Sequence, residues 1–390
     1  MAKAKTVKLG IIGVGNMGNG HITNIEAGKC PGIELVALCD RDASRLQAHA
    51  NYRHFSDSKE LIRSGAVDAV LIATPHYDHT TIGIDALKNG LHVMVEKPIS
   101  VHKADCERLI KAYKDRPKKK QVFSAMFNQR TNPNFQKVRE LLQSGELGEL
   151  RRVNWIITTW FRSEAYYASG GWRATWGGEG GGVLLNQCPH QLDLLQWITG
   201  MPSKVHAFCR FGQWHDIEVE DDVTAYLEYP NGATGVFVTT TGETPGTNRL
   251  ELVCEKGRVV VEGGKITWTR NTIEMSKYSK TTPTGFGRPD VWNIDIPVQG
   301  GGSAHAGVLQ NFAEAITSGA KLLAPAVEGI NSVELANAML LSTWTNKAVE
   351  LPLSGAAYER LLKNKIKNSK PKKKKKAVKK AKAADFASSY

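Results

Sequence analysis

Two spacings of apolar residues divide the chain near residue 130. Before that point, apolar runs of strand length alternate with segments in which apolar residues recur every three or four positions, a pattern typical of parallel strands connected by helices. The predicted strands are residues 9–14, 33–39, 67–73, 92–95 and 122–126, and helices are predicted at 79–88 and 104–113. Residues 1–130 are therefore expected to form an α/β domain.

A different pattern follows a predicted helix at residues 135–142. Strand-like stretches succeed one another, separated by turn signals such as Pro230-Asn231-Gly232, which favours an antiparallel sheet. They include residues 153–160, 205–211, 223–229, 233–240, 250–254 and 258–261. Helical patterns at 191–198, 304–317 and 326–346 are expected to cover one face of this sheet. Residues 131–362 are thus predicted to be an α+β domain with a large, mostly antiparallel, open sheet.

The second face of that sheet also needs a partner. Its strand stretches carry apolar residues at both odd and even positions, and extensive apolar surface is rarely left in water. We therefore expect a homo-oligomer, either a dimer or a tetramer, in which the sheet packs against a second copy of the chain.

The formal charge of +13 is concentrated at the end of the chain. Residues 361–390 hold 12 lysines and one acid, whereas the other 360 residues hold 39 basic and 37 acidic side chains. The main body thus has no basic bias that would favour nucleic acid. Residues 363–390 are predicted to be a disordered, solvated tail. Weak attraction of a polyanion is the alternative, and the lysine run is also similar to a nuclear localisation signal.

The cysteine pattern indicates a reducing compartment. Six cysteines are scattered without a Cys-x-x-Cys pair, which argues against a structural zinc site or a disulfide framework. No stretch is apolar enough for a signal peptide or a membrane span. We therefore expect a cytoplasmic protein without a structural metal.

The first predicted strand ends in a glycine-rich turn that opens a helix. In this context backbone N–H groups and the helix dipole can bind a pyrophosphate, although such turns also join strands to helices for steric reasons alone. The second strand ends at Asp40, whose carboxylate can bind both ribose hydroxyls of NAD and would repel the 2′-phosphate of NADP. The two features together predict a Rossmann domain that binds NAD. The residues of the turn are Gly13, Val14, Gly15, Asn16, Met17 and Gly18.

Two further details of the cofactor site stay open. Arg41 could stack on adenine or pair with a 2′-phosphate, so use of NADP is an alternative. Ala73, Thr74 and Pro75 close the third strand at the edge where ligands bind in such sheets. His79, at the start of the next helix, is either a cofactor contact or a structural residue of the first turn.

Directly after the fourth strand, at Glu96-Lys97-Pro98, the chain resembles the glucose-fructose oxidoreductase, inositol dehydrogenase and MocA family. The resemblance also covers the turn at 13–18, residues 73–75 and the run G-G-G-V-L-L-N-Q-C-P-H-Q-L-D at 180–193, in that order. It implies that Glu96, Lys97 and Asn128 contact the cofactor. At the substrate it adds His305, with Arg130 as a further candidate.

The resemblance implies catalytic roles for Lys97 and His190, both of which also contact substrate. Oxidation of an alcohol releases a proton from oxygen, and a lysine beside a positively charged nicotinamide has a lowered pKa that suits it to accept that proton. His190 would hydrogen-bond the reacting hydroxyl. Where inositol dehydrogenases of the family have an aspartate, this chain has Asn186, which can orient a hydroxyl but cannot take its proton. Asp193, one helical turn beyond His190, could orient His190 or cap a neighbour.

An aromatic and arginine-rich segment precedes that run. Aromatic rings suit the C–H faces of sugars, and arginines suit their hydroxyls. About half of these residues are expected to line the pocket, with Arg162, Tyr166, Trp172 and Arg173 as the substrate-binding candidates. The full segment is Trp160, Phe161, Arg162, Tyr166, Tyr167, Trp172, Arg173 and Trp176.

The leading hypothesis is an NAD-dependent dehydrogenase acting on a ring hydroxyl of a sugar, glycoside or inositol. A second hypothesis keeps NAD bound and uses transient oxidation to cleave a glycosidic bond. A third is a non-catalytic, dinucleotide-binding regulator, against which the presence of Lys97 and His190 argues.

Overall fold

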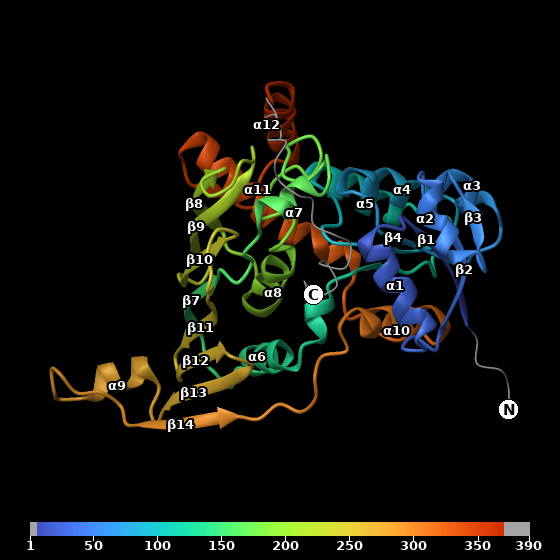
Figure 1. Ribbon diagram of the computed structural model, residues 1–390. Helices are drawn as coiled ribbons and strands as arrows, with labels where there is room; N and C mark the ends of the chain where they lie inside the picture. The colour runs from blue at the N-terminus through green and yellow to red at the C-terminus, as the bar shows by residue number, and fades with distance from the viewer. Residues whose placement is uncertain (1–5, 370–390) are drawn as a thin grey trace, which may run out of the picture.

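The computed structural model describes residues 6–369 and contains two sheets (Figure 1). The first sheet has six parallel strands in the order β3-β2-β1-β4-β5-β6, with helices connecting them, and thus confirms the predicted Rossmann-like domain. Its strands are β1 (Val7–Ile12), β2 (Ile33–Cys39), β3 (Arg53–Phe55), β4 (Ala69–Ile72), β5 (His92–Val95) and β6 (Phe123–Ala125). Its helices are α1 (Asn16–Glu26), α2 (Ala43–Leu46), η1 (Gln47–His49), α3 (Ser58–Arg63), α4 (His76–Lys88), α5 (Lys103–Lys114) and η2 (Asn128–Thr131).

The second sheet has nine strands in the order β14-β13-β12-β11-β7-β10-β9-β8-β15. Only the β7–β10 pair is parallel, so the prediction of a mostly antiparallel sheet is confirmed. The strands are β7 (Leu150–Ile157), β8 (Lys204–Phe211), β9 (Glu220–Glu228), β10 (Thr234–Thr240), β11 (Asn248–Cys254), β12 (Gly257–Glu262), β13 (Lys265–Asn271), β14 (Val291–Ile296) and β15 (Val349–Glu350).

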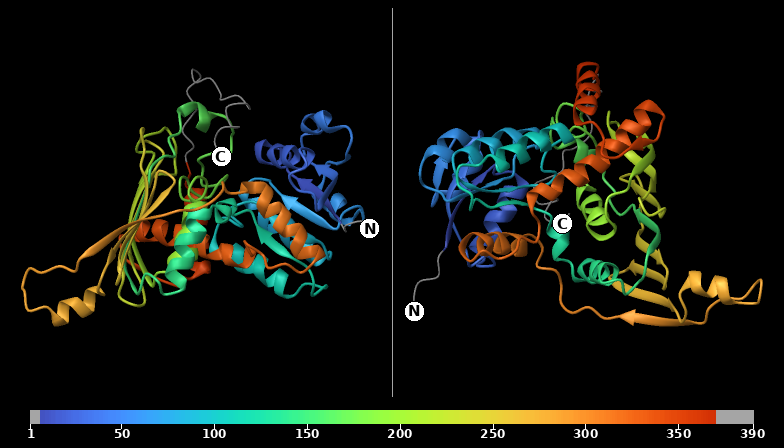
Figure 2. Two further views of the ribbon diagram at one scale, coloured as in Figure 1. Left: turned by 90° about the horizontal axis from the view of Figure 1, so that it is seen from below. Right: turned by 180° about the vertical axis from the view of Figure 1, so that it is seen from behind.

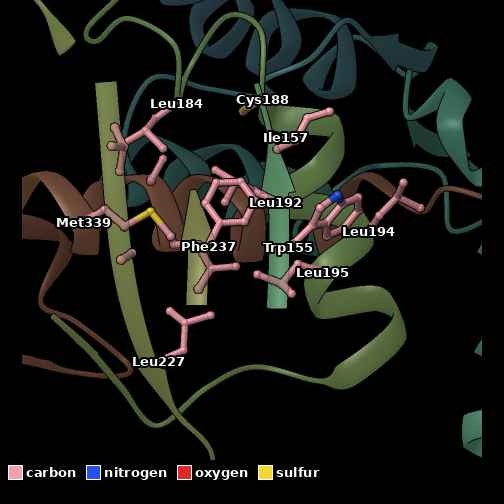
Figure 3. Close-up of a cluster of buried hydrophobic side chains, with 14 of the residues drawn as sticks. Trp155, Ile157, Leu184, Cys188, Leu192, Leu194, Leu195, Leu227, Phe237 and Met339 are labelled. Atoms are coloured by element: carbon pink, nitrogen blue, oxygen red, sulfur yellow. The ribbon is translucent and has the colours of Figure 1, made fainter. Parts of the chain in front are cut away.

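Helices cover the face of this second sheet that looks toward the first domain (Figures 1 and 2). Trp155 of β7 and Phe237 of β10 are fully buried there, and Leu192 and Met339 pack in the same core (Figure 3). The helices after the first domain are α6 (Pro133–Gln143), α7 (Glu164–Ala168), α8 (Pro189–Thr199), α9 (Met275–Thr281), α10 (Ala304–Thr317), η3 (Ala326–Glu328), α11 (Gly329–Thr345) and α12 (Gly355–Lys367). None of the helices within residues 6–369 is long and apolar enough to cross a bilayer.

The helix α10 packs on the first sheet, so the prediction that it covers the second sheet is wrong. Its apolar stripe, which includes Leu309 and Phe312, is buried with Leu9 and Ile11 of β1. An amphipathic pattern shows that one side of a helix is buried but not which sheet buries it. The chain therefore returns to the first domain after β14.

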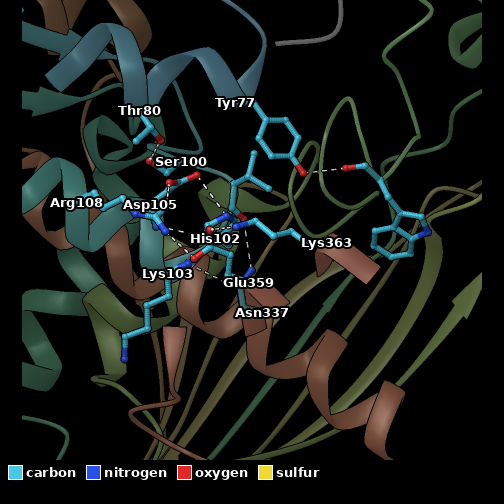
Figure 4. Close-up of polar contacts among 12 residues, drawn as sticks. Tyr77, Thr80, Ser100, His102, Lys103, Asp105, Arg108, Asn337, Glu359 and Lys363 are labelled. Carbon is cyan, nitrogen blue, oxygen red and sulfur yellow. Dashed lines mark hydrogen bonds and ion pairs between the residues drawn. The ribbon is translucent and has the colours of Figure 1, made fainter. Parts of the chain in front are cut away.

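The helix α12 corrects the start of the predicted tail. It runs to Lys367, so residues 363–367 are helical rather than disordered, and residues 370–390 lie outside the described part. Ion pairs join Glu359 of α12 to its neighbour Lys363 and to Arg108 of α5, which also pairs with Asp105 (Figure 4). The polar face of α12 is thus bound to the first domain.

A buried ion pair joins the two domains beside the site. Arg130 in η2 donates to both carboxylate oxygens of Asp193 in α8, at 2.7 and 2.6 Å, and both side chains are almost fully buried. A second carboxylate, Glu328, lies 2.5 Å from Arg130 and is partly exposed. Asp193 is therefore committed to Arg130 and does not orient His190.

We expect Arg130→Met to lower the free energy of unfolding by about 3–5 kcal/mol, because it leaves a buried carboxylate without its partner. Urea unfolding followed by circular dichroism measures the loss. Lys137→Met, which removes the more exposed pair with Glu140, is the matched control and should cost about 1 kcal/mol or less. Equal losses in the two variants would contradict this role of the pair.

Candidate functional site

A cavity of about 970 Å³ lies between the carboxyl ends of the first sheet and the residues around α8. Ligand sites in open parallel sheets lie at this edge. Most of the residues predicted from the sequence line it. From the first domain these are Gly13, Val14, Gly15, Asn16, Met17, Asp40, Arg41, Ala73, Thr74, Pro75, His79, Glu96, Lys97 and Asn128, and from the second they are Arg162, Tyr166, Trp172, Arg173, Asn186 and His190.

The glycine turn has the geometry of a dinucleotide cradle. Gly13 has a φ of 97°, and a Cβ there would lie 2.6 Å from the backbone oxygen of Ala73. Gly18 does not line the cavity. A Cβ at Gly18 would lie 2.0 Å from the oxygen of Gly13, so this glycine permits α1 to pack against the turn rather than contacting the cofactor. The N-terminus of α1 is thereby directed at the cavity.

Asp40 follows β2 at the same edge. Its carboxylate accepts hydrogen bonds from the backbone N–H of Val14, at 2.8 Å, and of Asp42, at 2.9 Å, and Arg45 lies 3.4 Å away. These contacts hold a carboxylate directly beside the glycine turn, where the ribose of a dinucleotide would lie. The cradle and this acceptor fit NAD.

Histidines fix the segment around Glu96. The two ring nitrogens of His79 each lie 2.8 Å from a backbone oxygen, those of Pro98 and Thr74, which favours the structural alternative for this residue. His21 lies 2.7 Å from Glu96 in a buried pair. Burial by itself would raise the pKa of Glu96, but the hydrogen bond and charge of His21 hold it at about 2.

Lys97 projects from this segment to the second domain. Its Nζ donates to the backbone oxygen of Asn186 at 2.8 Å. Burial lowers the pKa of the Lys97 ammonium below its ordinary value, while the negative charges of Glu96 and Glu179 oppose the shift. Lys97 is therefore a stronger proton donor than a solvated lysine, and its neutral form is populated at lower pH.

His190 lies in the first turn of α8, and the ionisable groups Lys97, His305 and Glu96 act on it electrostatically. Burial lowers the pKa of the imidazole well below its ordinary value, and the charge of Lys97 acts in the same direction. Its Nδ1 is buried and has no hydrogen-bond partner in the described part of the chain. A neutral imidazole with an unused ring nitrogen is suited to bind a hydroxyl.

Glu179 is a residue that the sequence analysis missed. Its carboxylate accepts hydrogen bonds from the side chain of Asn186 and from the backbone N–H of Ala174, and lies 4.0 Å from Arg173. Burial raises its pKa. The Asn186 side chain is thus bound to a buried carboxylate. The sequence did contain a signal, because Glu179 is the single acid within the glycine run at 177–182. A charged side chain does not help such a run to turn, so its presence indicates a specific partner.

The aromatic segment is divided between cavity, core and surface. Tyr167 and Trp176 are buried in the core of the second domain, and Phe161 is exposed. His305, predicted to bind substrate, does not line the cavity; its Nδ1 lies 3.4 Å from the Nδ2 of Asn128, which does. The remaining residues of the segment, Trp160, Arg162, Tyr166, Trp172 and Arg173, line the cavity.

Two family models match the chain, one in each domain. The first, an oxidoreductase family with an NAD-binding Rossmann fold, matches residues 7–124, and the second, a GFO/IDH/MocA C-terminal domain, matches residues 135–260.

Among curated relatives, the inositol 2-dehydrogenase of Salmonella typhimurium is 31% identical over 149 residues, which are 37% of this chain and 44% of that enzyme. The chain therefore matches less than half the length of that relative. The myo-inositol 2-dehydrogenase of Thermotoga maritima is 26% identical over 281 residues, 69% of this chain and 79% of that enzyme.

Among solved structures, the WlbA dehydrogenase of Chromobacterium violaceum, in complex with NADH and UDP-GlcNAcA, has a TM-score of 0.77 at 27% identity and covers 91% of this chain and 98% of its own. Levoglucosan dehydrogenase with NADH and levoglucosan has a TM-score of 0.74 at 19% identity, over 90% of this chain and all of its own, which shows the fold alone. The NAD-binding family model and the WlbA dehydrogenase structure solved with NADH confirm the prediction of NAD as cofactor.

We expect Gly13→Ala to weaken NADH binding at least about tenfold, a loss of about 1.4 kcal/mol, because the added Cβ meets the backbone at residue 73 and a positive φ is strained for alanine. Titration of NADH fluorescence measures the dissociation constant. Gly20→Ala in α1, where a Cβ meets nothing within 4 Å, is the control and should bind NADH normally. Unchanged binding by Gly13→Ala would exclude the turn as the cradle.

Proposed function

The chain belongs to the glucose-fructose oxidoreductase, inositol dehydrogenase and MocA family of NAD-binding oxidoreductases, and on that premise we propose that it is a dehydrogenase acting on a ring hydroxyl of a sugar, glycoside or inositol. The observation that carries the proposal is the approach of Lys97 to the Asn186–His190 segment across the domain junction. This approach assembles proton-transfer groups of both domains in one cavity.

NAD, when bound, supplies the acceptor for the hydride of the alcohol carbon. The chain must then position the alcohol and take the proton of its hydroxyl. His190, which lines the cavity, donates to or accepts from the hydroxyl through a ring nitrogen and holds the oxygen beside Lys97. Neutral Lys97 accepts the proton at Nζ, and its lowered pKa makes that neutral form available. In the direction of ketone reduction the same ammonium returns the proton.

The residues around Lys97 and His190 support proton transfer by the lysine and hydroxyl binding by the histidine. The Asn186 side chain donates to Glu179 and holds its own backbone oxygen toward Lys97. That oxygen accepts a hydrogen bond from the lysine and orients it. The related enzymes named inositol 2-dehydrogenase and WlbA dehydrogenase act in the same class of reaction by name, which supports a polyol or sugar as the substrate.

The free face of the second sheet supports a homo-oligomer. No helix of the described chain covers that face in either view (Figures 1 and 2). Four large apolar side chains from four neighbouring strands are exposed there, namely Phe208, Tyr226, Val236 and Ile156. A second copy of the chain would bury them. All six cysteines are free and buried, which agrees with the further proposal of a cytoplasmic location.

We expect Lys97→Met to lower the rate of alcohol oxidation about 10²–10⁴-fold while NADH still binds. In the wild type, kcat/KM for oxidation should rise with pH and level off below the ordinary pKa of lysine, because only the neutral amine accepts the proton. Initial rates of NADH formation across monosaccharides, inositols and glycosides measure both effects. Lys88→Met, at the exposed end of α4, should match the wild type. Full activity of the Lys97→Met enzyme would contradict the proposed mechanism.

We expect the double variant Phe208→Glu/Tyr226→Glu to be a single chain where the wild type is a dimer or tetramer, because four carboxylates or more would be buried in the shared interface. Size-exclusion chromatography with light scattering gives the masses. Asn51→Glu, on the surface of the first domain, serves as the control and should retain the wild-type mass. A single-chain wild type would refute the oligomer.

A further inference from the structure

The first domain lines the cavity with both acidic and basic side chains, whereas the charged side chains that the second domain contributes are arginines. The carboxylates that line it all come from the first domain, at Asp40, Asp57, Asp78, Asp85 and Glu96. The second domain contributes two arginines to the lining and no carboxylate. The end of the cavity that receives the substrate is therefore positively charged. Resting on the proposed function, we propose that the substrate carries an anionic group, a carboxylate or a phosphate, which Arg162 binds with the help of Arg173.

Arg162 is prepared to bind an anion. Its Nη1 donates to the backbone oxygen of Phe161 at 2.9 Å, while its Nε is buried without a hydrogen-bond partner in the described residues. It forms no ion pair with any carboxylate within residues 6–369. The guanidinium lies 5.2 Å from the ring centre of Tyr166 and 6.0 Å from that of Trp160. These rings limit the directions in which the charged group can turn.

Arg173 brings a second positive charge close to Tyr166. Its Nη1 donates to the hydroxyl of Tyr166 at 2.9 Å and its Nε to Ser169 at 3.1 Å. The guanidinium lies 4.6 Å from the centre of the Tyr166 ring. Both guanidinium groups thus lie close to the Tyr166 ring, and the Tyr166 hydroxyl lies 3.4 Å from the Asn186 side chain. An anion at the arginines would be adjacent to the catalytic segment.

Among the described residues, two buried carboxylates act on the cations at this end, and one of them, Glu96, is paired with His21. Glu179 lies 4.0 Å from Arg173 and also acts electrostatically on Lys97, so it cannot balance Arg162 as well. A nicotinamide ring adds a further positive charge when the cofactor is oxidised. Hydroxyls of a neutral sugar would leave this excess uncompensated, whereas a carboxylate or phosphate matches the planar fork of an arginine with two parallel hydrogen bonds.

The first experiment compares substrates that differ only in the anionic group. NAD reduction is measured at constant ionic strength with glucose, glucuronate and glucose 6-phosphate, and with galactose and galacturonate. We expect kcat/KM for at least one anionic member to exceed that of its neutral partner at least tenfold. The uronate and phosphate arms identify which anion is used.

The role of Arg162 is tested with the pair of anionic and neutral substrates that shows the largest preference. Arg162→Gln should remove most of that preference by raising KM for the anionic substrate more than KM for its neutral partner, and Arg162→Lys should retain part of the preference. Arg360→Gln, an equal loss of charge at an exposed position of α12 outside the cavity lining, should retain it all. Preferred turnover of neutral polyols, or a preference that Arg162→Gln leaves intact, would overturn the anion site while leaving the dehydrogenase proposal standing.

A binding experiment separates the two proposals. With NADH bound at saturation, glucuronate or inorganic phosphate should raise the Tm of the wild type and of Arg360→Gln but not of Arg162→Gln. If no alcohol of either charge is oxidised and this Arg162-dependent shift is present, the proposed dehydrogenase fails and the anion site stands. A Tm shift that is absent, or equal in wild type and Arg162→Gln, overturns the anion site.

Discussion

The hydrogen bond of a half-buried lysine ammonium between two domains is the interaction on which the site depends. Lys97 follows β5 of the first sheet, and its partner is the backbone oxygen of Asn186, just before α8 of the second domain. The contact requires the carboxyl edge of the first sheet to stay at a fixed distance from α8. The buried pair of Arg130 and Asp193 maintains that distance, because separation of the domains would leave each of these charges without its partner.

The contact between the two domains also changes the pKa values of Lys97 and His190. Burial at the junction lowers the pKa of both Lys97 and His190, and the charge of Lys97 lowers the pKa of His190 further. Two buried carboxylates limit the shift of the lysine, Glu96 from the first domain and Glu179 from the second. Neither carboxylate forms a direct ion pair with Lys97 in the described chain. Lys97 can therefore gain and lose its proton, whereas a tight buried salt bridge would have kept it protonated.

The placement of the acceptors, backbone donors and arginines gives the cavity two chemically different ends. Asp40 and the turn at Gly13 define an end that fits the ribose and pyrophosphate of a dinucleotide, since one supplies acceptors and the other backbone donors. Arg162 and Arg173 define the other end, with aromatic rings around them. Lys97 lies where the two ends meet. A substrate that binds the arginines is thereby placed against the cofactor at the one point where proton transfer is available.

The sequence by itself determined both sheets, the cofactor turn and most of the cavity lining, because these depend on local spacing: alternation of strands and helices, a turn of glycines, and a strand that ends in an acid. Only the tertiary structure decided that α10 returns to the first sheet, that Asp193 faces Arg130 rather than His190, and that Glu179 stands behind Asn186. A local pattern states that a side chain is buried or charged. Its partner is set by packing between segments far apart in the chain, and no local spacing encodes that choice.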